Sequence, residues 1–228
     1  MPEAAPTCWT VIRGAAAGRA EDREDFARRY EPIIRAYLAA RWTNGPLLAE
    51  IDDGVQEIFI DCFREGGVLE RADAEKPGGF RSFLYGVIRI AALRIESGRA
   101  RRDARSPSST VDLSGVPADE TSLSRVFDRE WAQTQVREAM RLLEERAREA
   151  GEPALRRIEL LRARFGEDLP IREIAARWGM DATRLHQEQT RARREFKKAL
   201  FDVVRFQITA PPEVVLRECE EILALLAG

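Results

Sequence analysis

A stretch from Ile174 to Leu185 constrains the fold of this chain more than any other. The apolar–small pair Ile174–Ala175 is followed by Gly179, and Leu185 comes six residues after that glycine. This spacing is typical of a helix-turn-helix, because the small residue lets two helices cross closely and the glycine accepts the left-handed backbone of a tight turn. Asp181 is a suitable N-cap for the second helix.

The second helix of this motif is expected to have one buried and one exposed face. The apolar residues that share the first face are Leu185, Ala192, Phe196, Ala199 and Leu200. The candidate DNA contacts share the opposite face: Thr183, Arg184, Gln187, Thr190, Arg191, Arg194 and Lys198. A helix in the major groove presents its N-terminal side chains to base edges, so the first turns, up to Arg191, are expected to reach bases or adjacent phosphates. Arg194 and Lys198 are expected to meet phosphates, which give affinity without sequence information.

Two other interpretations of the same stretch stay open. The basic face can be an ordinary solvated surface, or the helix pair can be a hairpin that docks on another protein. The glycine turn, the N-cap and the basic residues that follow them together favour duplex DNA.

The composition excludes several classes of protein. Strand signals are weak along the 228 residues, which favours an all-α fold, and the net charge of −2 means that any nucleic-acid surface is local. Three scattered cysteines and one histidine predict neither a disulfide framework nor a metal site, and they favour a cytoplasmic protein. With no nucleophile–base pair and no phosphate-binding glycine loop, we expect no enzyme and no cofactor. Apolar runs fall short of the roughly 20 residues that cross a bilayer, so we expect no membrane insertion.

Helical periodicity and breaker residues predict two small helical domains joined by a flexible linker. Residues 1–105 form the first domain, and residues 106–126, rich in serine and proline, form the linker. Residues 127–204 form the second domain, which starts with a long helix from about Arg129 and holds the helix-turn-helix. Residues 205–228 form an acidic C-terminal helical extension.

Three helices are expected in the first domain, each with an apolar stripe at helical spacing. The stripes run from Phe26 to Leu38, from Ile51 to Cys62 and from Phe80 to Ala91. The second of these helices carries Ile60 on its polar face. The polar residues around Ile60 are Asp53, Gln56, Glu57 and Arg64. This set is typical of a small protein-docking patch, although single exposed apolar residues are common and a plain solvated face is the alternative.

The third helix and its extension are strongly basic. Seven arginines and two acidic residues lie between Arg81 and Arg105. Tyr85 and Arg89 are expected to project outward together, and an aromatic ring beside an arginine is the pairing that holds unstacked bases or phosphates. Alone, such a charge run is usually just a solvated face.

These motifs together resemble a known family. Residues Asp53–Phe63 resemble the conserved-region-two helix of bacterial RNA polymerase sigma factors, and Phe80–Arg89 resembles the next helix in the extracytoplasmic-function (ECF) type. Ile174–Leu200 resembles sigma region four, and the order of the motifs is also that of the family. The chain has no room for the region-three domain of housekeeping sigma factors.

The resemblance implies a function and its partners. The family docks its region-two helix on the β′ clamp helices of RNA polymerase core, which makes Asp53, Gln56, Glu57, Ile60 and Arg64 the expected core contacts. Arg81, Tyr85 and Arg89 become the expected contacts to the minus-ten element of promoter DNA, beside a loop from Glu65 to Gly79. Region four would read the minus-thirty-five element and meet the β flap, and an anti-sigma regulator is a further candidate partner.

The chain departs from the family pattern at two places. Region four usually opens with Leu-Pro before an arginine-containing helix, and Gly151–Arg157 fits this only loosely. The tail at 205–228 exceeds a minimal sigma factor, and it could complete the core, contact a regulator or shield the recognition helix. The alternatives to a sigma factor are a helix-turn-helix transcriptional regulator and a helical adaptor, derived from a sigma factor, that no longer reads DNA.

Overall fold

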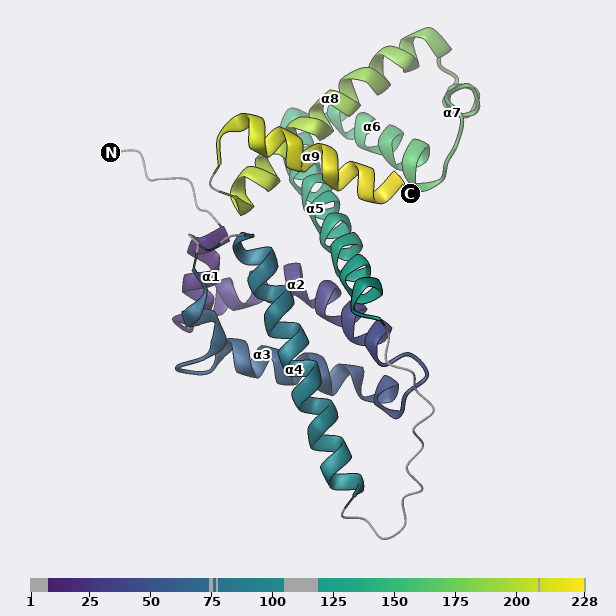
Figure 1. Ribbon diagram of the computed structural model, residues 1–228. Coiled ribbons are helices and arrows are strands. Elements are labelled where there is room, and N and C mark those ends of the chain that lie inside the picture. The colour runs from purple at the N-terminus through teal and green to yellow at the C-terminus, as the bar shows by residue number, and fades with distance from the viewer. Residues whose placement is uncertain (1–7, 74–75, 77, 105–118, 209, 228) are drawn as a thin grey trace, which may run out of the picture. The chain divides into compact units, whose positions relative to one another are not determined.

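The computed structural model describes residues 8–73, 76, 78–104, 119–208 and 210–227, and this part of the chain contains helices and no strand. The expected all-α class is therefore confirmed for the described residues. The elements in chain order are α1 (Cys8–Ala16), α2 (Ala20–Arg41), η1 (Pro46–Glu50), α3 (Ile51–Phe63), η2 (Val68–Arg71), α4 (Gly79–Asp103), α5 (Glu120–Ala150), α6 (Glu152–Leu161), η3 (Arg162–Gly166), α7 (Ile171–Trp178), α8 (Ala182–Gln207) and α9 (Pro212–Ala227) (Figure 1).

The chain divides into two compact units. Unit 1 comprises residues 1–134, 206–208 and 223–228, and unit 2 comprises 135–205 and 209–222. The long helix α5 contributes its first half to unit 1 and its second half to unit 2. Most of the linker expected at 106–126 lies outside the described residues, and its last part, from Glu120, is helical.

The core of unit 1 is built on α2. Its predicted stripe is buried, with Phe26, Tyr30 and Leu38 each at most 1% exposed. The Phe26 ring lies 4.7 Å from that of Tyr30 and 5.9 Å from that of Phe80 on α4, measured between centroids. These contacts join α2 to α4, as the periodicity predicts, because residues three and four apart share one face of a helix.

Helix α3 approaches the end of α2 unusually closely at Gly54. A Cβ atom at this position would lie 2.6 Å from a ring carbon of Trp42, so a glycine is needed there. Val55, Ile58 and Cys62 of the predicted stripe are buried, and Ile51 and Phe59 are partly buried against the same core. The polar face of α3 is consequently held outward.

Helix α4 buries Phe80, Leu84 and Ala91, as expected. Val87, which helical spacing from Phe80 and Leu84 would place on the same face, is only partly buried, and Ile88 is fully buried. The buried face of α4 is therefore rotated slightly from the expected one, toward Ile88. The apolar residues of α4 cover a wide arc, so the same side of the helix still faces α2.

Helix α5 begins at Glu120, well before the expected start near Arg129. Asp119 caps it, because its carboxylate accepts hydrogen bonds from the backbone N–H of Thr121 at 3.2 Å and from the Ser122 hydroxyl at 3.4 Å. Leu123, Phe127 and Trp131 then recur at helical spacing, and all three are buried in unit 1. The residues before Glu120 are rich in turn formers, so their composition predicts a linker there and not a helix cap at Asp119.

Aromatic rings anchor the first half of α5 in unit 1. The centroid of Phe127 lies 5.1 Å from that of Tyr85, in an edge-to-face arrangement, and 6.1 Å from that of Trp131. Trp131 in turn stacks on Tyr30 with a centroid distance of 6.0 Å. Pairs of this kind stabilise beyond the area that they bury.

Unit 2 has its own small apolar centre around the α7–α8 pair. Leu160 of α6, Ile171 and Ile174 of α7, and Leu185 of α8 are buried together, with Trp178 partly buried against them. In α9, Val215, Cys219 and Ile222 are buried, whereas Val214 and Leu225 are exposed. None of the described helices is both long enough and apolar enough to cross a membrane.

The anchoring of α5 can be tested by truncating one ring. Phe127→Ala is expected to lower the free energy of unfolding by about 3–5 kcal/mol, because a large ring is lost from a closed core. Arg129→Ala, on the exposed side of the same helix, is expected to change it by no more than about 0.5 kcal/mol. Urea denaturation followed by circular dichroism measures both, and equal effects would mean that α5 is not anchored by Phe127.

Candidate nucleic-acid interface

The turn between α7 and α8 has the geometry that its sequence predicts. Gly179 adopts a left-handed conformation with φ 60° and ψ 33°. The backbone N–H of Met180 closes the end of α7 by donating to the Ala175 carbonyl at 2.9 Å. Asp181 caps α8, because its carboxylate accepts a hydrogen bond from the Arg184 backbone N–H at 2.9 Å. The α7–α8 pair is therefore held by backbone conformation as well as by apolar packing.

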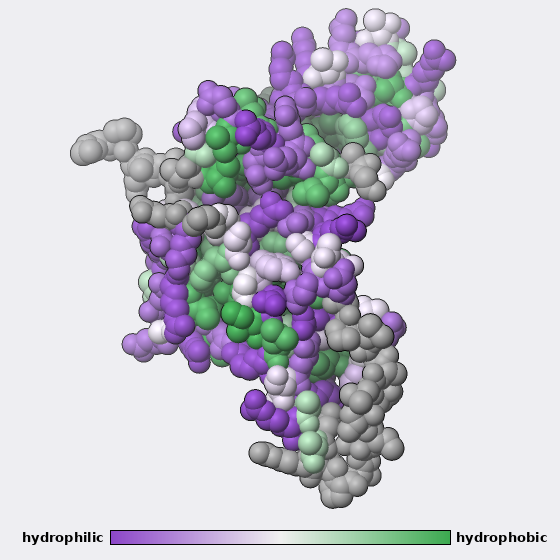
Figure 2. Space-filling view, viewed as in Figure 1, coloured by the Kyte–Doolittle hydropathy of each residue, from purple (hydrophilic) through white to green (hydrophobic). Residues whose placement is uncertain are grey.

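The two faces of α8 separate as expected. Leu185, Ala192, Ala199 and Leu200 are buried, and Phe196 is partly buried. The residues on the predicted recognition face are all exposed: Thr183, Arg184, Gln187, Thr190, Arg191, Arg194 and Lys198. Figure 2 shows that the face of unit 2 drawn there is mainly hydrophilic over α6 and α8. Exposure makes these side chains accessible to DNA, and their role in binding it stays a prediction.

Both carboxylates within the basic part of α8 are held by one arginine of α6. Arg157 donates from Nε to Glu195 at 2.8 Å and from Nη1 to Glu188 at 3.4 Å. The hydrogen bond to Glu195 is the main reason why the pKa of Arg157 lies above its usual value. Because Glu188 and Glu195 are compensated from the α6 side, the arginines and lysines dominate the potential of the exposed face.

A cleft of about 350 Å³ borders this face. Pro153 and Arg156 of α6 line one side, and Trp178, Arg184 and Arg191 line the other. Arg156 is an exposed cation beside the predicted contacts that the sequence did not single out. Only the packing of α6 on the α7–α8 pair brings it there, and no local pattern in the chain encodes that approach.

The predicted polymerase-docking residues lie on or beside one exposed face of α3. Asp53, Gln56 and Glu57 are exposed, and the side chain of Ile60 is 64% exposed. Arg64 is also exposed and lies directly after the helix, where the chain has turned to extended backbone. The structure thus presents all five residues to solvent, and their partner stays a prediction.

Helix α4 extends this exposed face with residues that the sequence did not single out. Arg94 reaches back to α3 and pairs with Glu57 at 3.0 Å and with Asp61 at 2.5 Å. Ile90 and Leu93, on the neighbouring turn of α4, are 66% and 41% exposed. In Figure 2, apolar side chains are exposed where α4 passes over α3. A helical wheel of either helix alone cannot show such a surface, because two helices share it.

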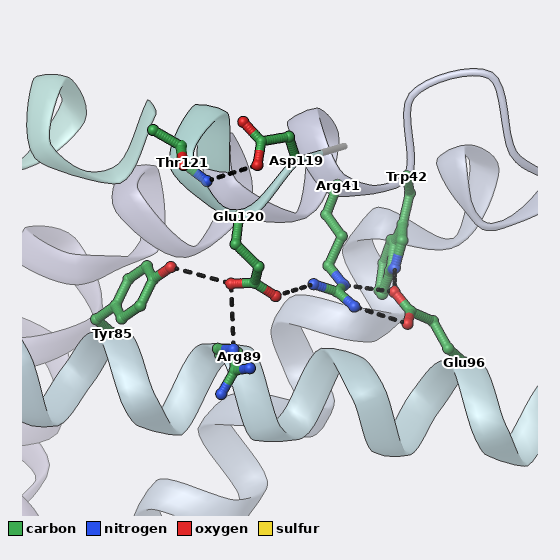
Figure 3. A network of polar contacts seen from close by, with 8 residues as sticks. All are labelled: Arg41, Trp42, Tyr85, Arg89, Glu96, Asp119, Glu120 and Thr121. Carbon is green, nitrogen blue, oxygen red and sulfur yellow. Dashed lines mark hydrogen bonds and ion pairs between the residues drawn. The ribbon is translucent and has the colours of Figure 1, made fainter. Parts of the chain in front are cut away.

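The predicted minus-ten residues of α4 are engaged by carboxylates of α5. Arg81 pairs through Nη2 with Asp128 at 2.7 Å. Arg89 donates from Nε to Glu120 at 3.1 Å, and the Tyr85 hydroxyl lies 3.3 Å from the same carboxylate oxygen (Figure 3). All three residues project to one side of α4, as expected, but that side faces the start of α5. The sequence could not reveal this, because it placed Glu120 in a linker.

Glu120 is the centre of a wider polar network (Figure 3). Its second oxygen lies 3.5 Å from Nη1 of Arg41, which also holds Glu96 through two hydrogen bonds. Trp42 donates its indole N–H to Glu96 at 2.9 Å. Partial burial raises the pKa of Glu120, but the hydrogen bond from Arg89 and the charges of Arg89 and Arg41 outweigh this, and the pKa lies below its usual value.

Within the part of the chain that the structure describes, no group of three histidine, cysteine or acidic residues is placed to hold a metal ion. Cys8 and Cys62 are buried, and burial raises the pKa of each thiol to about 12. Both thiols are therefore protonated at neutral pH and are poor nucleophiles.

The α7–α8 turn can be tested with a pair of identical substitutions. Gly179→Ala is expected to destabilise unit 2 by about 1–2 kcal/mol, because an L-residue is strained at positive φ. Gly86→Ala, inside α4 and with no atom within 4 Å of the added Cβ, is expected to stabilise unit 1 by about 0.5–1 kcal/mol. Thermal unfolding measures both, and the same sign for the two would contradict this account of the turn.

Known proteins give no direct assignment of this interface. A comparison with models of protein families finds no match to the chain, and a comparison with curated protein sequences finds none either.

Proposed function

We propose that this chain is a sigma factor of the ECF type, which brings RNA polymerase core to specific promoters in the cytoplasm. The observation that carries the proposal is the α7–α8 pair. All seven predicted recognition residues lie exposed on α8, which is entered through a left-handed glycine turn and an aspartate cap. The sequence motifs of α3 and α4 extend this from a general DNA-binding unit to a promoter reader.

In this proposal, unit 2 reads the minus-thirty-five element. The first turns of α8 enter the major groove, where Gln187 and Arg191 contact base edges. Arg194 and Lys198 contact phosphates further along the helix. The clamp of Arg157 on Glu188 and Glu195 supports this role, because it reduces the repulsion between α8 and the phosphate backbone.

Unit 1 binds the polymerase and the minus-ten element. The exposed face of α3, with Ile60 at its centre, docks on the β′ clamp helices of the core enzyme. Ile90 and Leu93 add apolar area next to it, and an apolar centre with a charged rim is the usual composition of such interfaces. Arg81, Tyr85 and Arg89 of α4 contact the opened minus-ten strand.

A second candidate function is a helix-turn-helix regulator or adaptor that does not act with polymerase. The pairing of Arg81 and Arg89 with carboxylates favours it, since those arginines are then structural. The two proposals differ in one property that can be measured, which is the binding of core polymerase.

Polymerase binding is tested by a charge on the α3 face. Ile60→Glu is expected to weaken capture of purified bacterial core polymerase at least tenfold, because it places a carboxylate in an apolar contact. Leu216→Glu, at an exposed leucine of α9, is the matched control and is expected to bind as the unchanged protein does. Pull-down at several protein concentrations measures both, and failure of the unchanged protein to capture the core would favour the regulator.

Promoter reading is tested on α8. Gln187→Ala is expected to lower the apparent affinity for promoters that carry the minus-thirty-five element by about 1–3 kcal/mol, and so to reduce transcription from them. The capture of polymerase is expected to stay unchanged. Gln189→Ala, two residues further on and turned away from the recognition face, is the control. Run-off transcription on promoters with and without that element measures the effect. Equal promoter selectivity in the two variants would show that the recognition face is misassigned.

A further inference from the structure

The first half of α5 carries two carboxylates that match the predicted DNA-binding residues of α4 in register. Arg81 and Arg89 are eight residues apart on α4, and Glu120 and Asp128 are eight residues apart on α5. Arg89 pairs with Glu120 and Arg81 with Asp128, so the two helices run antiparallel with their charges in step. Tyr85, between the two arginines, completes the match through its hydroxyl contact with Glu120.

Two features separate this arrangement from incidental surface pairing. The helix that carries the carboxylates is fixed by the buried side chains of Leu123 and Phe127, which lie between Glu120 and Asp128 in sequence. The three residues of α4 that contact these two carboxylates are also the three that the sequence singled out for a different partner. An arginine that binds a carboxylate uses the same donors that bind a phosphate.

We propose that Glu120 and Asp128 are intramolecular competitors of single-stranded DNA for the arginine–tyrosine face of α4. They occupy Arg81, Tyr85 and Arg89 in the free protein, and phosphates of an opened promoter strand replace them. This inference rests on the proposed function, because it takes that face as the site of the minus-ten strand.

The competition takes place between side chains and does not require α5 to leave. Arg89 and Glu120 are 46% and 50% exposed, so their ion pair is screened by solvent and weak. Leu123 and Phe127 are at most 1% exposed, so removing the helix would uncover two large apolar side chains. The carboxylates therefore exchange while the helix body stays anchored, and Glu120 keeps its contact with Arg41. Weak exposed pairs of this kind yield to a strand that offers several phosphates at once.

Binding of a short fluorescein-labelled single-stranded deoxyoligonucleotide to the full chain, measured by anisotropy, tests the competition. Glu120→Gln is expected to raise the affinity for the oligonucleotide roughly twofold to fivefold, which corresponds to the loss of one exposed ion pair. The double variant Glu120→Gln with Asp128→Asn is expected to raise this affinity further. Arg89→Ala in the Glu120→Gln background is expected to remove the gain. Glu24→Gln, which removes the same charge at an exposed position of α2, is the control and is expected to change little.

Equal affinity in Glu120→Gln and the unchanged protein, or the same gain in Glu24→Gln, would overturn the competition. So would the absence of measurable oligonucleotide binding by every variant. The proposed function is judged separately, by the capture of core polymerase, which does not depend on Glu120. A protein that captures polymerase but shows no effect of Glu120→Gln keeps its function and loses this inference.

A second measurement needs no variant at the site and so does not depend on how a variant folds. The pKa of the Glu120 carboxyl, followed by NMR in the unchanged protein, is expected to rise when the oligonucleotide saturates it. Arg89 no longer donates to the carboxylate in that state, and nearby phosphates further disfavour its charge. Arg41 lowers this pKa in both states, so a Glu120 pKa that does not change on saturation would show that DNA does not displace the carboxylate.

Discussion

The burial of Leu123, Phe127 and Trp131 in unit 1 is the interaction on which the arrangement of the polar surface depends. These residues fix the axial position and the rotation of α5 on the α2–α4 core. With that position set, Glu120 and Asp128 can fall only opposite Arg89 and Arg81. The apolar contact supplies most of the stability, and the partly exposed polar pairs above it add less.

Unit 2 likewise combines a rigid, buried element with an exposed, charged face. Its rigid element is the left-handed turn at Gly179 with the Asp181 cap, supported by Ile174 and Leu185. Its charged element is the exposed basic face of α8, where Glu188 and Glu195 pair with Arg157 of α6 and Glu188 also lies 3.4 Å from Arg191. In both units a buried scaffold positions arginines at the surface, and in unit 1 Arg81 and Arg89 are paired with carboxylates of α5.

The sequence could predict what is local and periodic. The stripe of α2, the apolar face of α3, the turn at Gly179 and the Asp181 cap all depend on residues within a few turns of one another. It could not predict pairings that depend on tertiary contact, such as Arg94 with Glu57 or Arg157 with two glutamates of α8. Nor could it predict that Arg156 of α6 lines the same cleft as Arg184. The early start of α5 was missed because its cap, Asp119, follows a stretch rich in serine and proline, and composition there favours a linker. The contact of Glu120 with Arg89 was missed for the same reason.

We propose that this chain directs RNA polymerase core to specific promoters. Reconstituted run-off transcription on fragmented bacterial genomic DNA, with mapping of the start sites, tests it most directly. We expect start sites that require the chain and that share one motif near minus ten and another near minus thirty-five. Start sites that are the same with and without the chain would contradict it.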